Sequence, residues 1–184
     1  MMNRRHREDV LVRRSVTVET IPTGYPVELE AGQLAQITQA LGSSFTLLVE
    51  GQLMRLKGAD ADAIGKQPPE TIVVPADLPL DELEPLIWDT LRTCYDPEIP
   101  VNIVDLGLVY RLEFQPADEA DKVRAVIDMT LTAPGCGMGE SIANEVCDKV
   151  LALPRVADIT VNLVFDPPWD RSMMSEEAML ALGL

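Results

Sequence analysis

The sequence predicts an α+β fold in which a small β-rich N-terminal domain precedes a two-layer α/β sandwich, a small sheet with helices on one face. Three observations lead to this prediction. Apolar residues alternate at period two in several segments, which is the pattern of half-buried strands. In the second half they also recur at helical spacing in two segments. A proline-rich stretch separates the two halves.

Composition and charge limit the classes of function. The chain has 184 residues, 47% of them apolar, which suffices for a packed core in one or two domains. The chain has 15 basic and 30 acidic side chains, which give a net charge of −15. Because this charge repels phosphate groups and anionic lipids, we expect neither nucleic acid nor a membrane as a partner. One His and three Cys are too few for a histidine metal centre or a disulfide framework, and they argue against a Ser-His-Asp triad. With no secretory signal or membrane-length apolar run, we expect a cytoplasmic location.

We divide the chain into two expected domains, residues 1–78 and residues 79–184. The boundary follows a change in composition, where four prolines lie among polar residues: Pro68, Pro69, Pro75 and Pro79. Proline at this density stiffens a chain and interrupts regular structure, as a linker requires. Acidity is also uneven, with seven basic and twenty acidic side chains in residues 79–184.

The N-terminal domain is expected to consist of strands. Residues 35–39 and 45–49 flank the turn 42–44, which predicts a hairpin. A short helix is the alternative for the first of these segments, but its glycine boundaries favour strands. Asp60 and Asp62 resemble a D-x-D metal loop, yet the Gly and Glu of a calcium loop do not follow. We therefore predict a polar turn there.

Two amphipathic helices are predicted in the second domain. Apolar residues recur at helical spacing in residues 83–94 and 142–153. Asp81, followed by Glu84 three residues on, resembles a capping box at the start of the first helix. The prolines that begin with Pro97 must end that helix, because they cannot continue it.

Three strands are predicted to form the sheet of the second domain. Residues 108–114, 123–131 and 159–165 each alternate at period two. The polar residues 115–121 are expected to join the first two strands as an antiparallel hairpin. One apolar sheet face and two amphipathic helices give the two-layer sandwich.

The sharpest chemical feature is the loop of residues 132–139, TAPGCGMG, between a strand and a helix. Its glycines allow backbone amides to converge on a bound group. Cys136 lies next to the positive end of the helix dipole, which favours the thiolate that attacks electrophiles and binds soft metals. In the alternative interpretation the small cysteine merely fits a glycine-rich turn, and the surrounding acidity raises its pKa.

The other two cysteines are interpreted as small buried hydrophobic residues, because Cys94 continues the apolar stripe of the first helix and Cys147 lies beside Val146 and Val150. The chain has no C-x-x-C motif, and a permanent iron–sulfur cluster needs about four thiolates. We therefore predict no permanent cofactor. A transient cluster or iron ion would need further ligands from a second protomer or a client.

Three carboxylates form a second candidate group: Asp96, Glu98 and Asp105. In one interpretation they line a pocket beside Cys136, as hard ligands for iron or as acid–base groups. In the other, Asp96 caps a turn and Asp105 binds local amides, and residue type alone favours this second interpretation.

The segment that ends the chain also has two interpretations. Trp169 with Met173 and Met174 is either a partner-binding patch or a segment folded back over the core edge. Ser175 is expected to cap a short closing helix that Gly183 ends.

Three motifs of the second domain resemble those of the metal–sulfur cluster biosynthesis (PaaD-like) domain family, in the family's order. They are DPEIPVNIVDLGLVY at 96–110, TAPGCGM at 132–138 and FDPPW at 165–169. The resemblance covers residues 79–184, while the preceding residues resemble the extra N-terminal domain of SufT-type assembly proteins. Gly137 stands where shorter members often have proline, and the cysteine-rich extension of PaaD is absent.

The resemblance implies a non-enzymatic auxiliary factor in assembling, maturing or transferring iron–sulfur clusters. It implies that Cys136 is the reactive cysteine and metal ligand, and that Thr132, Asp96, Glu98 and Asp105 take part in binding. The implied partners are the iron–sulfur assembly machinery, client apoproteins and a second copy of the chain as a homodimer. A protein-interaction scaffold without metal binding is the alternative. A thiol-dependent transferase ranks last, because only carboxylates are available as a base.

Overall fold

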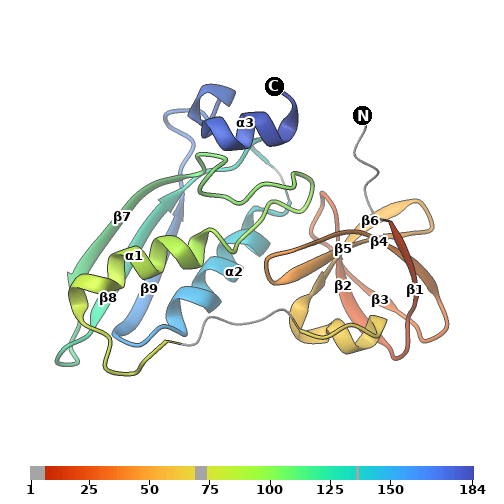
Figure 1. Ribbon diagram of the computed structural model, residues 1–184, viewed down its shortest axis with the longest axis horizontal. Coiled ribbons are helices and arrows are strands. Elements are labelled where there is room, and N and C mark those ends of the chain that lie inside the picture. The colour runs from red at the N-terminus through yellow and green to blue at the C-terminus, as the bar shows by residue number, and fades with distance from the viewer. Residues whose placement is uncertain (1–6, 69–73, 136) are drawn as a thin grey trace. The chain divides into compact units, whose positions relative to one another are not determined.

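The computed structural model describes residues 7–68, 74–135 and 137–184 (Figure 1). The chain forms two compact units. Met1–Thr71 and Pro97–Pro100 belong to the first, and Ile72–Asp96 and Val101–Leu184 to the second. Each unit contains one sheet, and the helices belong mainly to the second unit, so the predicted α+β class is confirmed.

The first unit is a six-stranded antiparallel sheet in the order β1-β4-β5-β6-β2-β3. Its strands are β1 (Glu8–Leu11), β2 (Val16–Thr20), β3 (Pro26–Leu29), β4 (Leu34–Leu41), β5 (Ser44–Val49) and β6 (Gln52–Lys57). The predicted hairpin is formed by β4 and β5, and Gly42 in their turn has a φ of 62°. The alternative of a helix over residues 34–41 is wrong, because Ala35 and Ile37 alternate toward one buried face.

The core of the first unit is aliphatic. Val12, Leu47 and Leu56 are completely buried, and Val18 is 1% exposed. Each such side chain contributes about 1.5–3 kcal/mol of hydrophobic stabilisation. A short 3-10 helix, η1 (Gly58–Ile64), follows the sheet and adds its own buried residues to the same core.

The second unit has a three-stranded sheet in the order β7-β8-β9, with β7 (Val109–Pro116), β8 (Val123–Met129) and β9 (Val156–Leu163). As predicted, β7 and β8 form an antiparallel hairpin. β9 is parallel to β8, and α2 (Gly139–Leu151) is the crossover between them. Figure 1 shows α1 (Leu80–Leu91) and α2 on the same face of this sheet.

The two helices cover the apolar face of β8, where Ala125, Ile127 and Met129 are completely buried. Both predicted helices are confirmed, and their apolar stripes are buried at Ile87 and Val146. In the described residues, no helix is both long and apolar enough to cross a membrane.

The predicted capping box of the first helix is wrong. The helix is capped by Pro79, and no side chain caps its first turn. The helix begins at Leu80, so Asp81 lies within its first turn and not at the N-cap, the position whose side chain can accept from the first amides. The Asp81 carboxylate is still favourably placed near the positive end of the helix dipole.

The end of the chain folds as predicted around a short helix. After η2 (Arg171–Met173), the Ser175 hydroxyl accepts a hydrogen bond from the Ala178 amide at 3.1 Å. α3 (Glu176–Leu182) then ends at Gly183, whose φ of 75° lies in the left-handed region.

Candidate functional site

The three sequence motifs of the second unit meet at one end of its sheet. Val109 at the start of β7 is paired with Met129 at the end of β8, which is paired with Leu163 at the end of β9. The first motif leads into β7, whereas the second and third follow β8 and β9. We call this end of the sheet the motif end.

Asp105 lies in the turn that leads into β7. The Asn102 side chain organises this turn, because its Oδ1 accepts hydrogen bonds from the amides of Val104 and Asp105 at 3.0 and 2.9 Å. Its Nδ2 donates to Oδ2 of Asp105 at 2.6 Å. The second interpretation expected the Asp105 side chain to bind local amides. In the structure the Asn102 side chain binds them instead.

The segment that carries Asp96 lies beside this turn. Tyr95 and Asn102 form an isolated antiparallel bridge, and the Ile103 amide donates to the Cys94 carbonyl at 2.9 Å. Asp96 itself is 7% exposed. Glu98 is exposed and belongs, with the rest of Pro97–Pro100, to the first unit.

Thr132 follows β8 at the motif end. The Thr130 amide donates to the Leu108 carbonyl at 2.8 Å, so the loop after β8 begins beside the end of the Asp105 turn. Thr132 is half-buried. The Thr130 hydroxyl is buried and has no hydrogen-bond partner in the part of the chain that the structure describes. A buried hydroxyl without a hydrogen bond lowers the stability of the folded protein by about 1–3 kcal/mol.

Cys136 lies outside the described residues, so the state of its thiol stays a prediction. Its described loop neighbours, Gly135 and Gly137, are exposed. α2 begins three residues after the cysteine, and no side chain caps its first turn. Gly139 allows this helix to approach the sheet closely, because a Cβ there would lie 2.5 Å from Cδ1 of Leu131.

The two remaining cysteines differ in burial. Cys94 is completely buried, as predicted. Cys147 is only partly buried, which corrects its interpretation as a core residue. Burial, and then the nearby Asp148 charge, raise the pKa of the Cys147 thiol.

The structure also distinguishes the two interpretations of the last motif. Nε1 of the half-buried Trp169 donates to the Leu106 carbonyl at 2.7 Å, and Met174 is 7% exposed. The Tyr110 hydroxyl donates to the Pro167 carbonyl at 2.9 Å. The segment therefore folds back over the core edge and the Asp105 turn.

Asn102 and Thr130 are two residues of this region that the sequence motifs did not single out. An Asn three residues before an Asp in a predicted loop is the sequence signal of a side chain that organises a turn, so Asn102 was accessible to the same reasoning. Thr130 carries no such signal, because an isolated Thr at a strand end is common. Among the described residues, no three His, Cys, Asp or Glu side chains lie together as a metal site.

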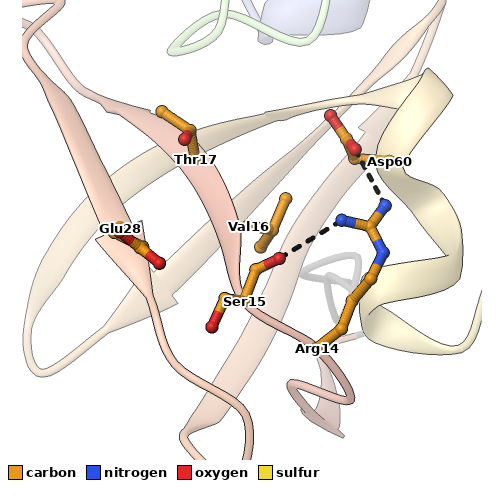
Figure 2. Close-up of a pocket in the computed structure, with 6 residues that line it drawn as sticks. All are labelled: Arg14, Ser15, Val16, Thr17, Glu28 and Asp60. Atoms are coloured by element: carbon orange, nitrogen blue, oxygen red, sulfur yellow. Dashed lines mark hydrogen bonds and ion pairs between the residues drawn. The ribbon is translucent and has the colours of Figure 1, made fainter.

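A pocket of about 330 Å³ lies in the first unit (Figure 2), and none of its lining residues belongs to the three motifs. It is lined by Arg14, Ser15, Val16, Thr17, Glu28 and Asp60. The Arg14 guanidinium donates to Asp60 at 2.8 Å and to Asp62 at 2.7 Å, and it lowers the pKa of Asp62. The expected polar turn is thus a 3-10 helix whose two carboxylates bind an arginine.

Together, the geometry defines a small α+β unit whose candidate site is made of loops at one sheet end. Residues 86–163 match the family described as iron–sulfur cluster assembly protein. An Fe–S protein maturation auxiliary factor of Porphyromonas gingivalis is 47% identical over 93 residues, which are 50% of this chain and 84% of that protein. The auxiliary factor SufT of Staphylococcus aureus is 42% identical over 48% of this chain and 96% of its own length.

This chain belongs to the iron–sulfur cluster assembly protein family, which confirms the resemblance inferred from the motifs. Among solved structures, a domain of unknown function from Bacillus anthracis is 42% identical, with a TM-score of 0.48. The match covers 56% of this chain and 94% of that one. These similar proteins therefore match only about half of this chain.

Proposed function

We propose that the protein is a non-enzymatic carrier that helps to place iron–sulfur clusters into client proteins. Cys136 contributes a thiolate to the cargo, while Thr132, Asp96, Glu98 and Asp105 contribute oxygen ligands or hydrogen bonds. The observation that carries this proposal is the meeting of all three family motifs at the motif end of one sheet.

The available ligands suit a transient cargo rather than a resident cluster. A cluster needs about four thiolates. Cys94 is buried and the pKa of the Cys147 thiol is raised, so neither is well suited to bind the cargo. We therefore assign the role of thiolate ligand to Cys136. A second protomer or the client supplies the missing ligands, and release then needs only the exchange of those ligands.

The proposed partners are the iron–sulfur assembly machinery, client apoproteins and a second copy of the chain. The proposed setting is the reducing cytoplasm, where a free thiol stays available. The cluster-handling domain spans residues 79–184, and residues 1–78 form a separate domain before it.

Anaerobic reconstitution with ferrous iron and sulfide tests the ligand role. We expect wild type to develop the visible absorbance of a labile cluster and to restore activity to apo-aconitase, and Cys136→Ala to lose both. Cys147→Ala is the matched control and should behave as wild type, because its thiol is partly buried. Equal absorbance and equal restoration in wild type and Cys136→Ala would rule out the ligand role.

The alternative function is a protein-interaction scaffold without metal binding. Its supporting observation is α3, where Leu180 is 76% exposed, with Leu184 beyond it at 59%. Alkylation kinetics separate the two functions. A Cys136 thiol that reacts no faster than cysteine in an unstructured peptide favours the scaffold, and a faster reaction favours the carrier.

A further inference from the structure

Asn102 is a nearly buried polar residue whose side-chain oxygen and nitrogen both form hydrogen bonds. It is 9% exposed. Its oxygen accepts from two successive main-chain amides, and its nitrogen donates to one oxygen of the Asp105 carboxylate. A buried amide with this many partners holds one orientation, because turning it by 180° would place a donor against two donors.

The Asp105 carboxylate is therefore held by one oxygen only. Oδ2 accepts the Asn102 hydrogen bond at 2.6 Å, whereas Oδ1 accepts no hydrogen bond from residues within the described ranges. The carboxylate is half-buried, so it is not simply a solvated surface group. Because the hydrogen bond from Asn102 occupies only one oxygen, the other oxygen can bind a cation.

The main chain of the same turn is held by residues near the end of the chain. The Ser175 amide donates to the Asp105 carbonyl at 2.8 Å, and the Trp169 indole donates to the Leu106 carbonyl. Gly107 has a φ of 73°, and a Cβ there would lie 2.2 Å from the Met173 carbonyl oxygen. With the backbone fixed in this way, the direction of the Asp105 carboxylate depends on its hydrogen bond to Asn102.

We propose that Asn102 is a positioning residue, which holds one oxygen of Asp105 so that the other faces the iron the protein carries. This inference rests on the proposed function and adds a residue to it. Hydrogen-bond partners that orient metal-binding groups commonly change metal affinity 10–100-fold when they are mutated. Asn102 acts on the cargo only through Asp105.

Exchanging the two residues tests this role. Asn102→Asp places two carboxylates within hydrogen-bonding distance, and Asp105→Asn removes the proposed ligand. The double variant restores the pair with donor and acceptor exchanged, because the new amide at 105 donates to the new carboxylate at 102. That carboxylate is then occupied by the amides of residues 104 and 105 and by its new partner, so it has no oxygen to offer.

Ferrous-iron affinity is measured anaerobically by competition with a chelator, and thermal unfolding is followed in the same samples. We expect each single variant to bind ferrous iron at least about tenfold more weakly than wild type. The double variant should recover the melting temperature but not the iron affinity. A purely structural pair would recover both, and that result would overturn the inference. Unchanged affinity in Asp105→Asn would also overturn it.

If Asn102→Asp does not fold, Asn102→Ser takes its place, because it keeps Asp105 and removes the Nδ2 donor that holds it; unchanged ferrous-iron affinity in this variant would overturn the inference. Failure of the proposed function has a different signature, since it requires unaltered client maturation in Cys136→Ala. If Cys136→Ala is defective while the double variant matures clients as wild type does, the roles of Asp105 and Asn102 are disproved and the carrier role of Cys136 stands.

Discussion

The indole nitrogen of Trp169 donates to the main-chain carbonyl of Leu106, 63 residues earlier in the chain, at 2.7 Å. Leu106 is completely buried and directly follows Asp105. The third motif of the family thus holds the first in place, and it does so through a main-chain group rather than a side chain.

Replacing Trp169 with Phe should lower stability by about 1–2 kcal/mol. Phenylalanine keeps an aromatic side chain, although a smaller one. The buried Leu106 carbonyl, however, loses its hydrogen-bond donor. Urea unfolding measures the change. Trp88→Phe is the matched control, since Trp88 is also half-buried but makes no side-chain hydrogen bond within the described chain. An equal loss in both variants would show that ring size, not the hydrogen bond, determines the effect.

Replacing Gly107 with Ala should cost more than replacing Gly135 with Ala. Both glycines have a positive φ, 73° and 79°, so each substitution carries about 1 kcal/mol of backbone strain. At Gly107 the new Cβ would also meet the Met173 carbonyl, whereas at Gly135 nothing lies within 4 Å. We expect a total loss of at least about 2 kcal/mol at Gly107 in denaturant unfolding. Similar losses at both positions would contradict the close packing of residue 173.

Replacing Thr130 with Val should leave stability unchanged or raise it by about 1 kcal/mol, because the buried hydroxyl has no partner within the described residues. Thr90→Val is the control. Its hydroxyl donates to the Leu86 carbonyl at 2.8 Å, and this variant should lose about 1 kcal/mol. The measurement is thermal unfolding of both variants. Destabilisation of Thr130→Val by as much as the control would mean that the hydroxyl is satisfied in solution.

The thiol of Cys147 should be alkylated more slowly than a free cysteine between pH 7 and pH 9. Its pKa is raised above the ordinary value of 9.0, first by burial and then by Asp148, so less thiolate is present at each pH. Iodoacetamide labelling followed by peptide mass spectrometry measures the rate. Asp148→Asn should speed the reaction modestly by removing the like charge, and an unchanged rate would assign the whole shift to burial.

The sequence allowed much of the fold to be predicted but little of the detailed geometry of the site. Helical spacing located both long helices, and period-two alternation located all three strands of the second unit, because burial of one face imposes those periods directly. The order β1-β4-β5-β6-β2-β3 in the first unit is set by pairing between distant strands, which local patterns do not encode.

The site was predicted through its motifs, whereas the contacts that shape it were not. The hydrogen bond between Asn102 and Asp105 depends on the conformation of one turn. The contact between Trp169 and Leu106 depends on how β9 is paired with β8, and no spacing in the sequence predicts it.

The antiparallel pairing of β7 and β8 has a practical consequence for labelling the protein. The turn that joins them begins after Pro116 and ends before Val123, at the far end of the ladder from Met129. Seven residues of strand separate that turn from the motif end by roughly 20 Å. A fluorophore or an affinity tag inserted there would therefore leave the three motif loops unobstructed.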